Sequence, residues 1–509
     1  MLLNLVWLAC VYVVLPYILY HRLYKPYCAW WHYYSQKAHV KHVGFPLPFI
    51  GNLVQIVRGY NNENKHPFNK ILENAKTAEG YTKTSMIFAF RDPWLVLNDV
   101  KIAEQLFTTY NQHFDKYPMV QIVTNQFLGN SLLFGSNSKE HKFKRKAMSP
   151  AFYRGKLQDL IATTRRHVLD VTIPNLRSKC EKGPVEVDII NEVTTMITSI
   201  IFKCTMGLDV TEHSIQFWEN GKARKTHFSY AVRECFTRAI DRLLTFHVCM
   251  WPEIFTDWHV TQSERDLKRN FLEVRQFVLN TWLDRKHNKE AAKAGEDLIS
   301  VMQQEPLFFD NDELAVNEIL TIIFAGSQTS ANATQNLIMH LCKHPEYKQR
   351  ILDDNEELTF YQMCFNEALR MQPPVYTSSP IIMTKDLNVN GLKIRKDDCI
   401  FIHLAAMAKD PSQWQRPNEF LPDRFDPNHP LFLTPSGVKR NPFAFSPFLA
   451  GHRICLGKTF IEEVSKETLP ALLRVFDFGM ENASSFKMPF NNMQQQHQPV
   501  VMVKVSARD

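Results

Sequence analysis

The stretch FLAGHRICLG, residues 448–457, places a single cysteine between closely spaced glycines and beside an arginine. An amphipathic stretch, 459–475, follows it directly and predicts a helix. The backbone N–H groups that open such a helix would face the Cys455 sulfur and favour its anionic form. Gly451 and Gly457 leave the backbone unencumbered around the sulfur, and Arg453 supplies a cation for nearby carboxylates. These features would suit a thiolate.

These residues resemble the signature F-x-x-G-x-R-x-C-x-G of the cytochrome P-450 family, which the sequence matches at every defining position. The resemblance implies haem b (iron protoporphyrin IX) as the cofactor, with Cys455 as the axial ligand of its iron. It implies that Arg453 pairs with a porphyrin propionate, that Phe448 shields the sulfur, and that Gly451 and Gly457 allow the cofactor to approach. An isolated cysteine would more often be an inert buried side chain.

A second motif, EALR, sets Glu367 and Arg370 one helical turn apart, where they can form an ion pair. Arg424, in FLPDRF, resembles the third member of the family's Glu-Arg-Arg core network. Taken without the resemblance, Glu367 and Arg370 would be an ordinary surface pair. The neighbouring segment KDPSQWQRPNEFLPDRF, 409–425, also resembles the family's connection between this helix and the cysteine loop.

The third motif, AGSQTS at 325–330, lies in the middle of an apolar-periodic segment, roughly Asp312 to Lys343, that predicts one unusually long helix. In the family this helix passes over the distal face of the haem. Ala325 and Gly326 are small enough to leave room for dioxygen. The hydroxyl of Thr329 can turn to the Ala325 carbonyl or toward dioxygen. We expect Phe324 to line the substrate pocket.

Three positions depart from the family pattern. Gln328 stands where an acid usually precedes the threonine, and an amide holds a water but supplies no carboxyl proton. His141, in HKFKRKAMSPAF, replaces the expected tryptophan, and Pro380 replaces the usual arginine and has no donor. We therefore expect propionate binding to depend on Arg145 and Arg453, with His141 as a further donor.

Composition bounds the remaining possibilities. The formal charge of +7 is spread along the 509 residues without a basic tract rich in aromatics, so no nucleic-acid partner is predicted. The ten cysteines contain no C-x-x-C pair, so neither zinc nor a disulfide framework is indicated. The chain shows no internal repeat.

The first twenty residues are uncharged and long enough to cross a bilayer, and cations follow at once. They predict a transmembrane signal-anchor at 1–21, and the positive-inside rule leaves the remainder in the cytosol. Two prolines and two glycines in 44–53 predict a stiff hinge, so 22–53 is expected to link the anchor to a catalytic domain at 54–509. We expect a single-pass protein of the endoplasmic reticulum membrane.

The expected fold is mainly α with a minor β part, a helical haem-binding body with small β-sheets and an N-terminal transmembrane helix. The β part is predicted by Leu387, Val389, Leu392 and Ile394, which alternate about an Asn390-Gly391 turn and indicate a hairpin.

The resemblance implies a haem-thiolate monooxygenase that inserts one atom of O2 into a lipophilic small molecule. NADPH would provide the electrons through a flavoprotein reductase that docks on basic residues, namely Lys142, Lys144, Lys146 and Lys458. Membrane lipid is the other expected partner. Gln328 leaves open a haem-thiolate isomerase or dehydratase acting on oxygenated lipids. A non-catalytic haem-binding protein is the remaining alternative, weakened by Thr329 and the small residues before it.

Overall fold

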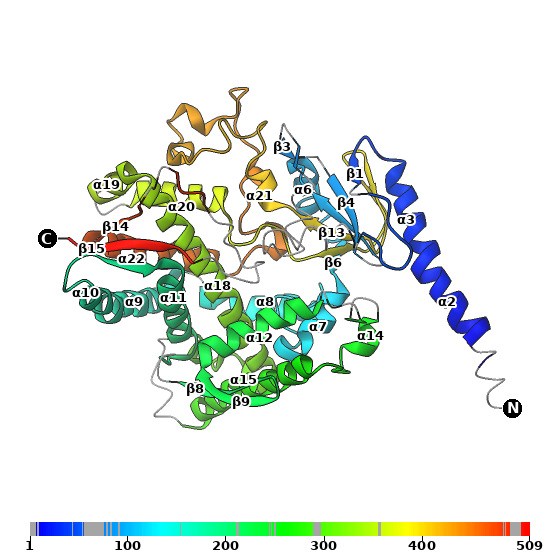
Figure 1. Cartoon of the computed structure of the whole chain (residues 1–509), viewed down its shortest axis with the longest axis horizontal. Coiled ribbons are helices and arrows are strands. Elements are labelled where there is room, and N and C mark those ends of the chain that lie inside the picture. Colours follow the sequence, from blue (N-terminus) through cyan, green and yellow to red (C-terminus); the bar gives the residue numbers. More distant parts are fainter. Residues whose placement is uncertain are drawn as a thin grey trace. The chain divides into compact units, whose positions relative to one another are not determined.

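The structure is a computed structural model of the whole chain (Figure 1). It describes residues 7, 10–42, 44–52, 54, 76–77, 80–81, 84–89, 92–152, 154–209, 213–243, 245, 247–248, 251–288, 297–354, 358–481, 483, 485–488 and 500–508. The chain forms two compact units. The first unit comprises Met1–Tyr117, Tyr376–Pro417 and Arg440–Arg453, and the second comprises Pro118–Val375, Asn418–Lys439 and Ile454–Asp509.

The first unit is built on a six-stranded sheet with the order β1-β4-β5-β13-β10-β6. Its strands are β1 (Val40–His42), β4 (Thr84–Ala89), β5 (Asp92–Leu97), β13 (Cys399–Ile402), β10 (Ile381–Met383) and β6 (Phe114–Lys116). β13 has the sequence CIFI and is buried at every position, as a run of apolar and β-branched residues in a central strand should be. It pairs in parallel with β5 and antiparallel with β10.

Two small hairpins and several helices complete this unit. The hairpins pair β2 (Lys76–Thr77) with β3 (Gly80–Tyr81) and β11 (Leu387–Val389) with β12 (Leu392–Ile394). The helices are η1 (Cys10–Val14), α2 (Leu15–Leu19), η2 (Tyr20–Tyr24), α3 (Lys25–Tyr34), α6 (Val100–Phe107), α21 (Leu404–Met407), η7 (Pro442–Ala444) and η8 (Gly451–Arg453).

The predicted hairpin at Asn390-Gly391 is confirmed. Val389 pairs with Leu392, and both central turn residues have positive φ, 51° at Asn390 and 87° at Gly391. These are the angles that a tight two-residue turn of this kind requires, and Asn and Gly adopt them at the lowest cost. The four alternating apolar residues are buried, which explains the period of two in the sequence.

The N-terminal segment is helical from residue 10 to residue 34, where η1, α2, η2 and α3 follow one another (Figure 1). In the part of the chain that the structure describes, no helix is both long and apolar enough to be a membrane span. Residues 1–6, 8 and 9 of the expected anchor lie outside the described residues.

The second unit is mostly helical. Its helices are α7 (Pro118–Leu128), α8 (Lys139–Met148), η3 (Ser149–Phe152), α9 (Arg154–His167), η4 (Val168–Thr172), α10 (Ile173–Lys179), α11 (Ile189–Met206), α12 (Phe228–Leu243), α14 (Pro252–Phe255), α15 (Gln262–His287), α16 (Leu298–Met302), α17 (Pro306–Phe309), α18 (Asp312–Lys343), α19 (Pro345–Asp353), α20 (Thr359–Met371), η5 (Pro422–Phe425), η6 (Pro430–Phe432) and α22 (Lys458–Val475). Its sheets are β14 (Phe476–Gly479), β15 (Met502–Ala507) and β7 (Val185–Asp188), in that order, and the hairpin of β8 (Ser214–Glu219) and β9 (Lys222–His227).

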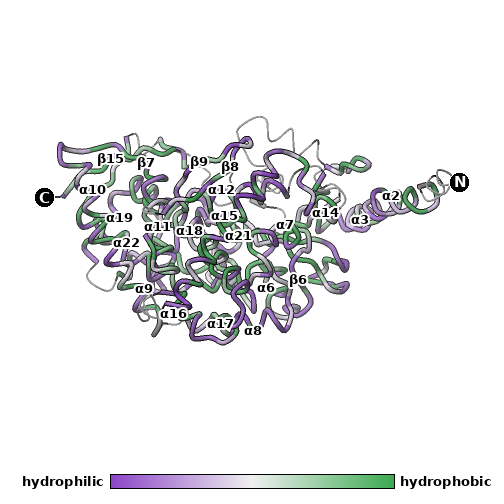
Figure 2. The backbone as a smooth tube through the Cα atoms, turned by 90° about the horizontal axis from the view of Figure 1, so that it is seen from below, coloured by the Kyte–Doolittle hydropathy of each residue, from purple (hydrophilic) through white to green (hydrophobic). Residues whose placement is uncertain are grey.

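The long predicted helix is α18, and its bounds are the predicted ones. Asn311 caps its N-terminus by accepting a hydrogen bond from the Leu314 N–H. The helix packs along α11 and also contacts α15 and α20, so it is buried on nearly all sides. Hydrophobic and hydrophilic residues alternate along the helices of the chain (Figure 2), as expected for helices with one buried face. The mainly helical class with small sheets is thus confirmed.

Candidate active site

Cys455 lies just before α22, and its side chain is exposed. Neighbouring protein atoms nevertheless desolvate the sulfur, which raises the pKa of the thiol. Hydrogen bonds from the Gly457 and Lys458 N–H groups oppose the increase, and so does the positive charge of Arg145. The first turn of α22 therefore directs its donors at the sulfur, as the sequence predicted.

The chemistry around Cys455 fits a haem thiolate ligand. A side chain added at Gly457 would meet none of the described atoms within 4 Å, so packing against the protein does not require glycine at this position. An accessible sulfur with N–H donors behind it and open backbone beside it can accept a large planar cofactor, whose metal would bind the thiolate form.

Arg145 and His141 come from the same helix, α8. Arg145 donates to the carbonyl of Ile454, the residue before Cys455, over 2.6 Å. His141 is buried, and its Nε2 lies 3.2 Å from the Leu132 carbonyl. The expected contact of these two residues with a propionate stays a prediction.

In the first unit, Gly451 has a φ of 63°, and a Cβ added there would come within 2.9 Å of the Phe107 carbonyl oxygen. Glycine is therefore required both by the left-handed backbone and by the close approach of α6. Phe448 and Arg453 are half-buried in the same unit. The expected role of Phe448 in shielding the sulfur stays a prediction.

Lys116 is a residue that the sequence interpretation missed. It ends β6 and pairs with Ile381 of β10, and the next N–H, that of Tyr117, donates to the Pro380 carbonyl over 3.1 Å. Burial and then the positive charge of Arg453 lower the pKa of the Lys116 amine to about 7, against the opposing effect of Asp115. Two basic side chains thus lie close together, next to the position where the family's arginine is absent.

Glu367 joins two arginines in the core of the second unit. Its carboxylate accepts two hydrogen bonds from Arg370, of 2.7 and 2.8 Å, and one of 3.1 Å from Arg424. The Leu421 N–H adds a fourth over 2.8 Å. All three charged side chains have no exposed surface, so the structure brings together the network predicted from the EALR motif.

Residues 325–329 of α18 are half-buried, whereas nearly all other positions of the helix from Leu314 onward are buried. The Thr329 hydroxyl donates to the Ala325 carbonyl over 2.6 Å, and the Gln328 amide donates to Asn332 Oδ1 over 2.9 Å. Bonding a carbonyl four residues back loosens a helix locally. The AGSQTS segment therefore presents polar groups on an accessible part of an otherwise buried helix.

The sequence matches the family model for cytochrome P450 over residues 42–505. The chain belongs to the cytochrome P450 family. Among its curated relatives are cytochrome P450 3A6 of Oryctolagus cuniculus, 26% identical over 91% of each chain, and cytochrome P450 4d2 of Drosophila melanogaster, 25% identical over 85% of this chain and 87% of the relative. Cytokinin hydroxylase of Arabidopsis thaliana is 25% identical over 78% of this chain and 76% of the relative.

This cytochrome P450 is accordingly a haem-thiolate monooxygenase, an oxidoreductase that uses haem b, O2 and electrons from NADPH that reach it through a reductase. Lipophilic substrates and a redox partner are general to the family. The family membership confirms the enzyme class and the cofactors that the cysteine signature implied.

One sequence-based interpretation of this P450 stays a prediction, and another needs correction. A Cβ on Gly326 would lie 3.2 Å from Cδ1 of Ile201 in α11, so the close packing of two helices also favours glycine at this position. The expected room for dioxygen at Ala325 and Gly326 stays a prediction. Lys144 was placed on a basic docking face, but its side chain is only 3% exposed. Its amine donates to the Asn130 carbonyl over 2.6 Å and pairs with Glu140 at 2.6 Å.

The other basic residues of the expected docking face differ from Lys144. Lys142, Lys146 and Lys458 are exposed.

Phe324, expected in the substrate pocket, is buried and stacks on Phe236 of α12 with ring centroids 3.3 Å apart. Phe324 is the residue directly before the accessible segment of α18, residues 325–329.

Proposed function

We propose that this P450 inserts one atom of O2 into a lipophilic small molecule, with electrons from an NADPH-dependent flavoprotein reductase. The accessible 325–329 segment of α18, which belongs to the same compact unit as Cys455, is the observation that carries the proposal. Haem bound by the thiolate supplies the activation of O2 and the transfer of one oxygen atom to the substrate. The Phe324 and Phe236 rings provide an apolar wall beside that segment.

The remaining site residues have distinct roles in this proposal. Cys455 is the axial ligand, and Gly451 and Gly457 hold the backbone that presents it. Phe448 shields the sulfur. Arg453, Arg145 and His141 bind the porphyrin propionates.

Lys116 joins the propionate-binding set as a replacement for the arginine that Pro380 lacks. Its desolvated amine and the Arg453 guanidinium repel each other, and a carboxylate placed between them would remove this repulsion. The β6–β10 pairing holds Lys116 one residue away from the Pro380 position, so a cation from the neighbouring strand stands beside the lost one.

Lys116→Met should therefore weaken haem retention. Losing one charge-assisted hydrogen bond predicts haem transfer to apomyoglobin that is about tenfold faster or more. Lys101→Met, a change at an exposed lysine of α6, is the matched control and should leave the transfer rate unchanged. Equal rates for the two variants would contradict a role of Lys116 in cofactor binding.

Thr329 and Gln328 manage protons in this proposal. Gln328 and Thr329 are adjacent residues of the accessible segment; the Thr329 hydroxyl donates one turn back to Ala325, and the Gln328 amide donates one turn forward to Asn332. The Gln328 side chain holds a water at this point, but its amide has no acidic proton to donate. Proton delivery then depends on that water and on the Thr329 hydroxyl.

Gln328→Glu should raise the fraction of NADPH electrons recovered in product by about twofold or more, because a carboxyl group can deliver protons that the amide cannot. Its new carboxylate can accept a hydrogen bond from the Asn332 amide in place of the present one. Product formed per NADPH consumed is the measurement. Gln328→Met, of similar size, should fall below the wild type. Unchanged or lower coupling in the Glu variant at full haem content would show that the acid is supplied elsewhere.

The reductase is proposed to bind at Lys142, Lys146 and Lys458, whose charges complement an acidic partner. Purified protein should turn over members of a lipid panel only when both NADPH and the reductase are present.

In the double variant Lys142→Glu, Lys146→Glu, the reductase concentration at half-maximal rate should rise about tenfold at low salt and much less at high salt. Lys182→Glu, at an exposed residue elsewhere in the unit, is the control.

A different outcome of the experiment with the lipid panel would identify the alternative function. Turnover of a hydroperoxide without NADPH or reductase, and none of the lipid panel with them, would favour the isomerase or dehydratase that Gln328 suggested. Consumption of no NADPH with any lipid would favour a non-catalytic haem protein.

Membrane lipid is proposed as a further partner, with residues 1–21 as a single-pass anchor in the endoplasmic reticulum and the catalytic part facing the cytosol. Several Tyr and Trp side chains between residues 17 and 31 are exposed. Both residue types are enriched at membrane interfaces. In the second unit Trp251, Ile254, Trp258 and Val260 are exposed around α14. Deletion of 1–21 should convert an alkali-resistant membrane protein into one that alkaline washing extracts.

A further inference from the structure

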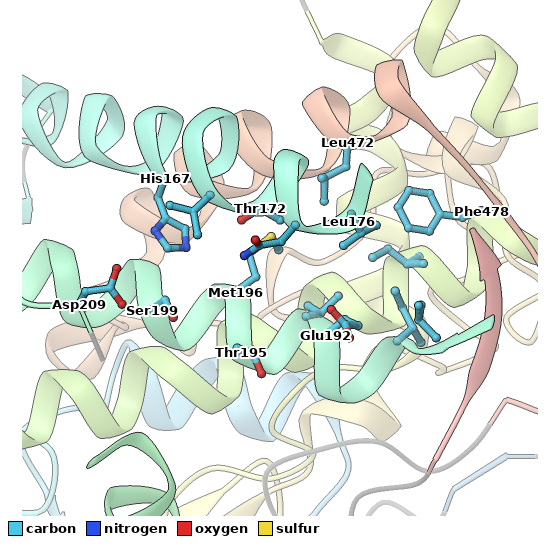
Figure 3. Close-up of a pocket in the computed structure, with 16 residues that line it drawn as sticks. His167, Thr172, Leu176, Glu192, Thr195, Met196, Ser199, Asp209, Leu472 and Phe478 are labelled. Carbon is cyan, nitrogen blue, oxygen red and sulfur yellow. The ribbon is translucent and has the colours of Figure 1, made fainter. Parts of the chain in front are cut away.

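A cavity of about 100 Å³ lies in the second unit, apart from the α18 residues 325–329 and Cys455. The end of α9, η4 and α10 form one wall, and α11 forms the facing wall (Figure 3). Leu472 of α22 and Phe478 of β14 lie at one end, and His167, Ser199 and Asp209 lie at the other (Figure 3). The cavity thus has an apolar end and a polar end.

His167 is the unusual residue of this cavity. Its side chain is 4% exposed, and its Nδ1 is buried without a hydrogen-bond partner among the described residues. Burial lowers the pKa of the imidazole, the charge of Lys203 lowers it further, and Asp209 opposes both effects. A neutral imidazole with an unsatisfied ring nitrogen costs free energy that a ligand hydroxyl could recover.

The carboxylates at the cavity are already paired. Asp209 lies 3.6 Å from the Lys203 amine, and Glu192 lies 2.5 Å from the Lys179 amine. Neither acid is therefore left to select a cation. A water molecule could bond His167 at the polar end, but Leu176, Met196, Leu472 and Phe478 offer it no partner in the rest of the cavity. The lining favours an uncharged molecule that is mostly hydrocarbon.

The backbone beside the cavity departs from a regular α-helix. A π-helical turn, η4, begins directly after His167 and widens the helix between α9 and α10. Pro174 follows in the first turn of α10 and has no N–H to continue the regular ladder. Turns of this kind are rare and occur frequently at functional sites. Here the wide turn contributes Val171 and Thr172 to the lining.

We propose that this cavity binds a small uncharged hydroxylated molecule, such as a phenol, at a site distinct from the substrate pocket. The ligand hydroxyl bonds His167 Nδ1, and its hydrocarbon part contacts the apolar end of the cavity. A hydroxyl suits either tautomer of the imidazole because it both donates and accepts. The enclosed space of about 100 Å³ is smaller than the cavity of about 150 Å³ that accommodates benzene, but the cavity is partly open to solvent, so a single ring can bind with part of it outside.

The test uses the holoenzyme with its substrate pocket blocked by an azole that ligates the haem iron. Binding of 4-fluorophenol and of fluorobenzene is followed by fluorine NMR. In the wild type the phenol should bind about three- to tenfold more tightly than fluorobenzene, the worth of one hydrogen bond. His167→Phe should remove this preference, and Met196→Trp, which fills the cavity, should abolish binding of both probes.

His227→Phe makes the same substitution at an exposed histidine of β9 and should retain the wild-type preference. The CO spectrum of each reduced variant reports whether its haem site is intact. Equal affinity of the two probes in the wild type, or no binding once the azole is present, would overturn the proposal even if a variant failed to fold. A preference that persists in folded His167→Phe would overturn it as well.

Discussion

Glu367→Ala is expected to prevent accumulation of folded holoprotein. The substitution leaves the Arg370 and Arg424 guanidinium groups in the core, fully buried, without the carboxylate that now accepts from both. Removing one partner of a buried ion pair typically costs about 3–5 kcal/mol, because the remaining charge can neither leave nor be neutralised. A loss of this size is a large part of the free energy of unfolding of an ordinary domain.

The measurement is the yield of folded protein and its haem content per polypeptide, together with the denaturant midpoint of any fraction that folds. Glu467→Ala is the matched control, because Glu467 also accepts two hydrogen bonds from an arginine, Arg165, at 2.8 and 2.9 Å, but that arginine side chain is 61% exposed. An exposed pair contributes about 1 kcal/mol or less. Equal effects of the two substitutions would mean that the buried network does not hold the fold together.

Local patterns in the sequence predicted a good part of this structure. The Asn390-Gly391 turn and the bounds of α18 follow from backbone preferences and periodicity, which depend on nearby residues. The contact of Glu367 with Arg370 is one helical turn long and is equally local. The contact with Arg424 was predicted only because the motif spacing resembled that of the family.

The residues whose environments were predicted wrongly, or were not predicted, depend on contacts between distant segments. Lys144 has the composition of a surface lysine, and its burial is set by Asn130 on the preceding loop. The packing of Gly326 on Ile201 joins two helices far apart in the chain. Lys116 acquires its neighbours through the pairing of β6 with β10, more than 250 residues along the sequence. No local period encodes such partners.

Cys455→Ala is expected to abolish monooxygenase activity completely. The alanine methyl group cannot ligate iron. The N–H groups of Gly457 and Lys458, which now face the sulfur, are hydrogen-bond donors and cannot take its place as a ligand. The strongly red-shifted Soret band of the reduced CO complex should be present in the wild type and absent from the variant, even where haem remains bound. The measurement is this spectrum together with the haem content per polypeptide.

Cys28→Ala supplies the matched control, because Cys28 is also an exposed free cysteine but lies on α3 in the other compact unit. Its spectrum and activity should equal those of the wild type. If folded, haem-loaded Cys455→Ala kept the red-shifted band, another residue would be the axial ligand. The roles assigned to Gly451, Gly457 and the α22 N-terminus would then be wrong together, because each is defined by its position around this one sulfur.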